Sequence, residues 1–196
     1  MSRFIIGVDE AGRGPLAGPV AVGVVSVRRN FDIAKAFPHL RDSKLVTPLA
    51  RERLYALLIK FSKEGKLTFC VRFARPKTID THGLTYAVRG AVYRGVRALA
   101  PSPKNVKVLL DGLLYAPKEY KQETIIGGDE NEPIIALASI VAKVRHDRLM
   151  RRVAKLYPHY GFEVHKGYGT KKHYSAIKKY GLCDIHRRSF CGIDRG

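Results

Sequence analysis

The feature that most limits the fold is a pair of apolar runs near the start of the chain, at residues 4–8 and 18–27. Their β-branched residues, bounded by glycine and charge, predict two strands that pair as a hairpin. Similar runs at residues 67–74, 106–110 and 123–126 predict three more strands. The chain therefore gathers strands early and is expected to build a sheet.

Helical patterns follow and separate the later strands. Four helices are predicted, over residues 48–64, 78–99, from Pro133 onward, and 171–180. Thr47 and Thr170 are typical N-caps of the first and last of these helices, and Gly65 and Gly181 are typical stops. We expect residues 78–99 to form one continuous helix in spite of three internal glycines.

This order of elements predicts one three-layer α/β (α+β) domain, with a mixed central sheet flanked by helices. Because 45% of the residues are hydrophobic, the chain can bury a substantial core. We expect a main domain over residues 1–156 and a basic, helical C-terminal extension over residues 157–196 packed on it.

The cellular setting is inferred from what the sequence lacks. The apolar stretch at residues 15–27 is too short to span a membrane and follows two acidic residues, so it does not read as a signal peptide. Three widely spaced cysteines do not form a disulfide framework or a zinc motif. We therefore expect a soluble, cytoplasmic protein that makes no membrane contact, and a monomer because no symmetric apolar face is evident.

Charge is the strongest compositional signal. The chain has 36 Lys and Arg against 17 Asp and Glu, a net charge of +19. Residues 143–188 carry 13 of these cations and only three acids, together with five histidines and five tyrosines. Basic residues interleaved with rings are typical of a surface that binds nucleic acid. A merely solvated basic surface is the alternative that composition leaves open.

Four acidic residues stand at the ends of apolar runs, where an ionised carboxylate is costly unless a cation compensates it. Asp9 and Glu10 end the first strand, Asp111 ends the fourth, and Asp129 follows a Gly-Gly turn. If those two strands are neighbours, the acids meet at one sheet edge. Oxygen ligands favour Mg²⁺ or Mn²⁺, and a pair of such ions suits attack on a phosphodiester. Turn, capping or salt-bridge roles are the alternatives.

Seven blocks in order along the chain closely resemble the signatures of the ribonuclease HII family. They are GVDEAGRGPLAGPVAVGVV at 7–25, DSK at 42–44, LLDG at 109–112, GGD at 127–129, ASIVAKV at 138–144, HKGYGT at 165–170 and HRRSF at 186–190. The resemblance implies a ribonuclease H-like fold and cleavage of the RNA strand of RNA/DNA hybrids. It extends to single ribonucleotides in duplex DNA, with a 3′-hydroxyl and a 5′-phosphate as the products.

The resemblance also implies roles for particular residues. It makes Asp9, Glu10, Asp111 and Asp129 the catalytic ligands of two divalent cations, Mg²⁺ or Mn²⁺, with Asp9 the best candidate for a shared ligand. Substrate contacts at the DNA–RNA junction are implied for the following residues: Gly12, Arg13, Gly14, Ser43, Lys44, Ser139, Lys143 and Tyr168. Glycines around an arginine let the backbone approach a ribose 2′-hydroxyl while the guanidinium meets a phosphate. A glycine turn, ring packing and an ordinary helix surface are the alternatives.

Two rival functions remain at this stage. The related ribonuclease HIII group carries an extra N-terminal domain and lacks the GRG block, and here a strand is expected from Phe4. A non-catalytic nucleic-acid-binding protein would need only the basic region and would have no use for four clustered acids. Leu45, Gly127 and His146 depart from the commoner family pattern without touching an implied metal ligand.

Overall fold

The computed structural model describes residues 2–38, 40 and 47–192 and contains one mixed five-stranded sheet. The strands lie in the order β3-β2-β1-β4-β5, with bounds β1 Phe4–Ala11, β2 Val20–Arg28, β3 Leu67–Ala74, β4 Val106–Asp111 and β5 Lys121–Ile125. β2 pairs antiparallel with both β1 and β3, whereas β4 pairs parallel with β1 and β5. The predicted hairpin is confirmed, and the first and fourth strands are neighbours, which is the condition under which the acids at their ends meet.

Helices and short turns connect and cover the strands. Their bounds are α1 Ile33–Ala36, α2 Pro48–Lys63, α3 Pro76–His82, α4 Leu84–Leu99, α5 Gly128–Asn131, α6 Pro133–Leu156, η2 Pro158–Tyr160, α7 Phe162–His165, α8 Lys171–Tyr180 and η3 Arg188–Phe190. The two predicted N-caps are confirmed, since the hydroxyl of Thr47 accepts from the Ala50 N–H and that of Thr170 accepts from the His173 N–H.

Two sequence predictions about elements are wrong. Residues 78–99 form two helices, α3 and α4, because Gly83 between them has φ +85°, which ends one helix and redirects the chain into the next. The first strand does not stop at residue 8 but continues through both acids to Ala11, since β2 pairs with it over that whole length.

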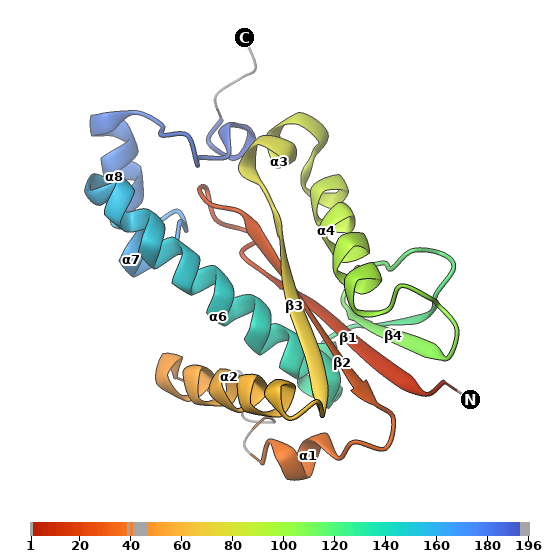
Figure 1. Cartoon of the computed structure of the whole chain (residues 1–196). Coiled ribbons are helices and arrows are strands. Elements are labelled where there is room, and N and C mark those ends of the chain that lie inside the picture. Colours follow the sequence, from red (N-terminus) through yellow and green to blue (C-terminus); the bar gives the residue numbers. More distant parts are fainter. Residues whose placement is uncertain (1, 39, 41–46, 193–196) are drawn as a thin grey trace.

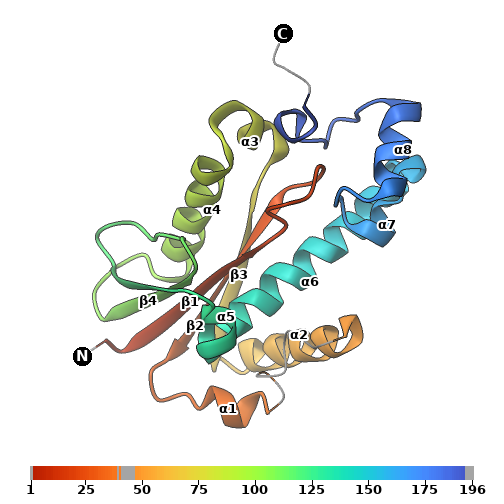
Figure 2. The same cartoon turned by 180° about the vertical axis from the view of Figure 1, so that it is seen from behind.

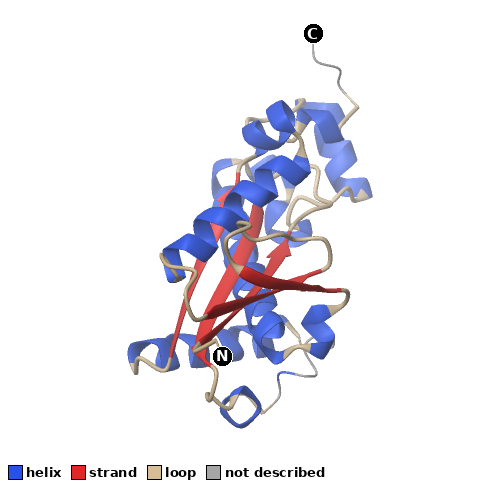
Figure 3. Cartoon of the chain, turned by 90° about the vertical axis from the view of Figure 1, so that its right-hand side faces the viewer, coloured by secondary structure: helices blue, strands red, loops and turns tan. Residues whose placement is uncertain are grey.

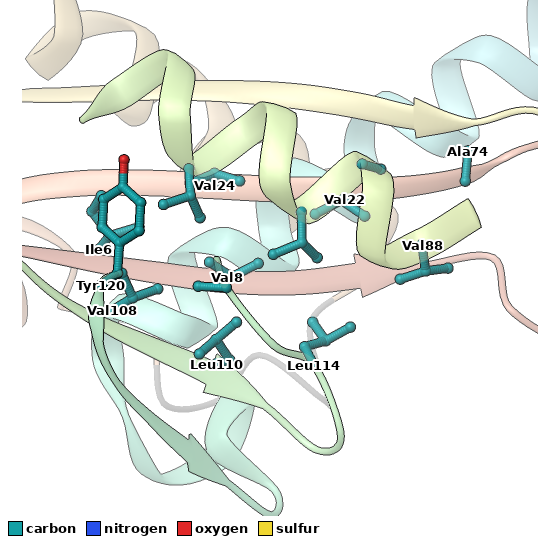
Figure 4. Close-up of a cluster of buried hydrophobic side chains, with 14 of the residues drawn as sticks. Ile6, Val8, Val22, Val24, Ala74, Val88, Val108, Leu110, Leu114 and Tyr120 are labelled. Atoms are coloured by element: carbon teal, nitrogen blue, oxygen red, sulfur yellow. The ribbon is translucent and has the colours of Figure 1, made fainter. Parts of the chain in front are cut away.

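The sheet lies between two layers of helices, as Figures 1 and 2 show from opposite sides. On one face α4 packs on the strands, and Figure 4 shows Val88 of that helix in the same buried cluster as Val8 and Val22. On the other face α6 and α2 pack in a second apolar cluster that includes Leu58 and Leu137. Figure 3 shows this layering from the side and confirms the predicted three-layer α/β architecture with a mixed sheet.

Helix α6 lies unusually close to the sheet, and Gly23 of β2 makes this possible. A Cβ atom on Gly23 would be 2.2 Å from the carbonyl oxygen of Ala138, so any larger residue would push the helix away. This contact sets α6 against β1 and β2, which places Ser139 and Lys143 near the ends of the central strands. Backbone contact therefore fixes one wall of the functional site.

The C-terminal elements pack on the far end of α6 through a third, small apolar cluster. It joins Met150 and Ala154 to Phe162 of α7, Ala176 of α8 and Ala17 of the β1–β2 loop. The division of the chain at residue 156 stays a prediction. Within the described ranges, none of the helices has the length and apolar character that a membrane crossing requires.

Candidate active site

Asp9 and Asp111 are brought together by the parallel pairing of β1 with β4. Val8 and Leu110, which precede them, are register partners and face the α4 cluster, so by alternation both acids face α6. Asp9 is only 5% exposed. Burial, then the charge of Glu10 and more weakly that of Asp111, raises the pKa of Asp9 to about 8. The strand pairing therefore creates a crowded, strongly unfavourable concentration of negative charge.

Glu10 and Asp129 line a groove of about 430 Å³ beside this pair. Glu10 forms a 3.0 Å salt bridge with Arg13, while burial, the largest cause, raises its pKa. Its second oxygen, Oε2, is buried and has no hydrogen-bond partner within the part of the chain that the structure describes. Asp129 lies in α5, and the α5 residue Gly128 donates its N–H to Asp111 Oδ1 at 2.7 Å. The structure thus gathers all four predicted acids around one end of β1 and β4.

The cationic side of the groove comes from the GRG loop, α2 and α6. Arg13, Arg51 and Lys143 line it. Lys143 also forms a 2.9 Å ion pair with Asp147; burial acts to raise the pKa of Asp147, but hydrogen bonds from His146 and Lys143 outweigh it and lower that pKa to about 2. Acids and cations therefore face one another across a single cavity.

The predicted substrate residues fall into two groups. Six of the eight line this groove: Gly12, Arg13, Gly14, Ser139, Lys143 and Tyr168. Ser43 and Lys44 lie outside the described residues. The ring of Tyr168 is 43% exposed and lies beside Gly14, since a Cβ atom on Gly14 would be 3.7 Å from its Cε1 atom. The structure therefore brings the GRG loop and Tyr168 together on one wall.

Arg187 holds the GRG loop in place from beneath. Its guanidinium is fully buried and donates to the carbonyl oxygens of Gly12 and Arg13, each at 2.6 Å, and of Gly18 at 2.9 Å. Burial lowers the pKa of Arg187 to about 10, so it stays charged at neutral pH. It lies 174 residues from Arg13 in sequence, so local patterns could not reveal the contact, although its HRRSF block marked the segment.

A chain of histidines holds Tyr168. The backbone N–H of Cys183 donates to His186 Nδ1 at 2.9 Å, so His186 carries its proton on Nε2 and donates to His173 Nε2 at 3.0 Å. His173 then carries its proton on Nδ1 and donates to the carbonyl of Tyr168 at 2.9 Å. Only the neutral forms of the two rings satisfy this order of bonds. His186 and Arg187, adjacent in sequence, therefore support the two substrate-facing segments separately.

Sequence reasoning missed two further residues at the groove. Arg51 projects from the first turns of α2, which the sequence treated only as a core helix. His146 is fully buried against the GRG loop, since a Cβ atom on Gly12 would lie 2.5 Å from its Nε2 atom, and that nitrogen has no hydrogen-bond partner among the described residues. Its departure from the commoner family residue was the available signal.

The sheet order, the carboxylates at the ends of two central parallel strands and the adjoining basic groove define a nuclease with a ribonuclease H-like fold. Comparison with solved structures supports this class. A ribonuclease H2 from Pyrococcus horikoshii superposes with a TM-score of 0.76 at 28% identity, covering 95% of this chain and 93% of that one. Bst-RNase HIII superposes with a TM-score of 0.65 at 20% identity, covering 92% and 63%.

The sequence comparisons then resolve the family. The family model described as Ribonuclease HII matches residues 6–193, and the chain belongs to the ribonuclease HII family. A ribonuclease HII from Caldicellulosiruptor saccharolyticus is 44% identical, covering 96% of this chain and 87% of its own. One from Endomicrobium trichonymphae is 42% identical, covering 97% and 86%. The protein is therefore an endoribonuclease that cleaves the RNA strand of RNA/DNA hybrids, which removes the non-catalytic alternative.

Proposed function

We propose that this enzyme cleaves at single ribonucleotides within duplex DNA as well as in longer hybrids, by a two-metal mechanism. The observation that carries the proposal is the burial of Asp9 among Glu10 and Asp111 at the edge of a basic groove. Four carboxylates placed together lower stability and repel phosphate unless cations bind between them. The products are a 3′-hydroxyl and a 5′-phosphate.

The donor set fits hard divalent cations such as Mg²⁺ and Mn²⁺, because every candidate ligand is a carboxylate oxygen. Glu10 Oε2 is buried and has no partner among residues 2–38, 40 and 47–192, so it is an oxygen that a cation would satisfy. Within the described ranges no three His, Cys, Asp or Glu side chains form a ready-made cation site. Glu10 is paired with Arg13, and Asp111 with Gly128, so cation binding requires both acids to exchange partners.

Two bound cations would activate water and stabilise the leaving oxygen, so no side-chain general base is needed. Asp9 is the best-placed shared ligand. It is the most buried of the four acids, and the charges of both Glu10 and Asp111 act on it. A metal-bound structure of a similar protein is consistent with this chemistry, since Bst-RNase HIII was determined in complex with Mn²⁺.

The remaining groove residues orient the nucleic acid. The exposed backbone of Gly14 can meet a ribose 2′-hydroxyl, and buried Gly12 lines the groove beside it. Arg13 is 44% exposed and can meet a neighbouring phosphate. Tyr168, beside Gly14, packs on the following deoxyribose, where a second 2′-hydroxyl would crowd the ring. Ser139 and Lys143 face the same cavity from α6 and contact phosphate. We place this activity in a cytoplasmic monomer whose residues 157–196 form the extension that supports Tyr168.

The experiment is a cleavage assay on three duplexes: all-DNA, DNA with one ribonucleotide, and a continuous RNA/DNA hybrid, each with and without Mg²⁺ or Mn²⁺. We expect metal-dependent cleavage of the second and third duplexes only, with a 5′-phosphate on the downstream fragment. Cleavage in the presence of a chelator would contradict the metal mechanism. Cleavage of the hybrid without cleavage of the single-ribonucleotide duplex would contradict the proposed junction recognition.

A further inference from the structure

A second groove lies between the edge strand β3 and helix α4, on the face of the sheet opposite to α6, which Asp9 and Asp111 face. The two elements run side by side in Figure 1, and the cavity between them has a volume of about 750 Å³. It shares no lining residue with the acidic groove. It also lies outside residues 143–188, the segment in which the sequence concentrates its positive charge. Nothing in the catalytic site accounts for it.

The charge of this groove is entirely positive. Four arginines line it and no Asp or Glu does: Arg72, Arg75, Arg89 and Arg94. Within the described part of the chain, the salt bridges use other cations, so these four guanidinium groups are not neutralised by carboxylates. Like charges held around a cavity repel one another, and a bound anion would relieve that repulsion. The groove is therefore suited to an anionic ligand.

Two of the arginines are held in position by the edge of the sheet. Arg94 donates to the carbonyl of Phe73 at 3.2 Å, and Arg72 donates to the carbonyl of Val71 at 3.1 Å. These bonds cap an otherwise unpaired strand edge. Each uses a single N–H of a guanidinium that has five, and the planar fork that remains matches phosphate geometry. Edge capping does not explain Arg75 and Arg89, which line the same cavity.

Aromatic rings stand among these cations. Tyr86 and Tyr93 of α4 both line the groove, and Tyr86 is 52% exposed. The guanidinium carbon of Arg89 lies 5.9 Å from the centre of the Tyr86 ring. Exposed rings between arginines provide faces on which unpaired bases stack, whereas the bases of a duplex are already stacked on one another. The combination favours a single strand over a duplex or a bare anion.

We propose that the groove between β3 and α4 binds single-stranded nucleic acid, with its arginines on the phosphates and its tyrosines against the bases. Because the site is separate from the acidic groove, it can hold an unpaired strand while a duplex occupies the catalytic site. The enzyme would then remain attached beside its target at places where single-stranded and duplex segments adjoin.

The test compares two double charge reversals in the full chain. Arg75→Glu with Arg89→Glu alters the groove at two exposed residues whose side chains make no hydrogen bonds with the described residues. Lys118→Glu with Lys121→Glu makes the same charge change at two exposed lysines away from it. Binding of a short, labelled single-stranded DNA of mixed sequence is measured by fluorescence anisotropy at several salt concentrations.

We expect the groove variant to bind the strand at least about tenfold more weakly with a shallower salt dependence, and the lysine variant to change much less. Tyr86→Ala should weaken strand binding by about tenfold without altering the salt dependence. Cleavage of a blunt RNA/DNA hybrid should be the same in all three variants. That readout separates this proposal from the proposed catalytic function.

Three outcomes would overturn the inference. Equal losses in the arginine and lysine variants would show a general charge effect with no built site. Displacement of the strand by ATP at concentrations near the Kd of the strand would assign the groove to a free nucleotide. Displacement by poly-glutamate but not by unlabelled single-stranded DNA would assign it to an acidic protein segment.

Discussion

Two groups of buried ionisable side chains lie along α6, the carboxylates near Ser139 and the histidines near Met150. Burial disfavours the charged form in both groups, so it shifts the pKa of an acid and the pKa of a base in opposite directions. It raises the pKa of Asp9 to about 8 and lowers that of His186 to about 4, the latter with a further contribution from His173. The same physical cost therefore acts on an acid at one end of the helix and on a base at the other.

The difference lies in how each group is relieved. The histidines satisfy one another as neutral rings, from the N–H of Cys183 to the carbonyl of Tyr168, so nothing external is required. The carboxylate group is not complete in this way, since Glu10 Oε2 has no hydrogen-bond partner among the described residues. A buried group that is complete on its own supports structure, whereas one that is incomplete awaits a ligand. This comparison separates the residues that position substrate from those proposed to hold cations.

The largest expected effect is at the incomplete group. Asp9→Asn should lower the rate of hybrid cleavage by at least about a thousandfold, because it removes an anionic ligand from the centre of the proposed cation site. Binding of the hybrid at low salt should persist, since the basic walls of the groove are unchanged. The exposed Asp184→Asn is the matched control and should retain full activity. Undiminished turnover in the Asp9 variant would reject the proposed assignment.

The next effect is at the support of the GRG loop. Arg187→Ala should lower the free energy of unfolding by about 3 kcal/mol, because it deprives the carbonyls of Gly12, Arg13 and Gly18 of their buried donor. Urea denaturation measures this change, and KM for the junction substrate should rise at the same time. Arg188→Ala, the neighbouring exposed position, should change stability by less than about 0.5 kcal/mol. Similar losses in both variants would contradict the role given to Arg187.

The dependence of the free energy of unfolding on pH tests the contrast between the histidines and the carboxylates directly. His186 has a folded pKa below that of the unfolded chain, so its contribution is present above about pH 6.5 and is lost as pH falls toward 4. Between pH 7 and pH 5 this loss amounts to about 2 kcal/mol. Asp9 acts oppositely, since its raised pKa makes the metal-free protein less stable as pH rises from about 4 to 8.

Urea denaturation of metal-free Asp9→Asn sharpens the histidine effect, because the titration of Asp9 is then absent and only the raised pKa of Glu10 still opposes it. His173 faces the His186 ring with a lowered pKa of its own, and its burial adds to the loss in acid. Tyr160 and Cys183, the other titratable neighbours of His186, stay neutral in this range because burial raises the pKa of each. A stability that does not fall from pH 7 to pH 5 in this variant would contradict the neutral chain.

The smallest effect is expected at the exposed end of the histidine chain. Tyr168→Ala should lower kcat/KM on the single-ribonucleotide duplex by about tenfold, through loss of ring packing on the sugar. Stability should be nearly unchanged, because the side chain is 43% exposed. Tyr174→Ala, an exposed tyrosine of α8, serves as the control. An unchanged kcat/KM for the Tyr168 variant would remove this residue from the proposed recognition site.

Much of the fold was predictable because its signals are local. Alternating apolar runs located the strands, and Thr47 and Thr170 located two helix starts, since a cap and its N–H lie three residues apart. The break at Gly83 was missed because residues 78–99 contain three glycines, and the sequence does not show which of them adopts a positive φ. Asp9 and Asp111 were predictable as a pair because acids at the ends of adjacent parallel strands must meet.

The support of the site was not predictable, because it depends on contacts between distant segments. Nothing near Arg187 in the sequence distinguishes its contacts from those of the other arginines. Only the fold places its guanidinium beneath Gly12 and Arg13. The direction of the bond between His173 and His186 depends on two backbone groups, the N–H of Cys183 and the carbonyl of Tyr168, that only the folded chain brings to the two rings. The arginine groove was not predictable either. Its lining residues come mainly from β3 and α4, which a helix separates in the sequence and which meet only in the folded chain.

Helix α6 continues beyond the sheet, and this has a consequence for shortened forms of the protein. Its last turns carry Met150 and Ala154, which are covered by Phe162 and Ala176 from the segment that follows. Removal of that segment would expose these apolar side chains on the last turns of α6, and the truncated protein would tend to aggregate. A shortened form would therefore need polar replacements at positions 150 and 154 to stay dispersed, and it would still lack Tyr168 and the support that Arg187 gives to the GRG loop.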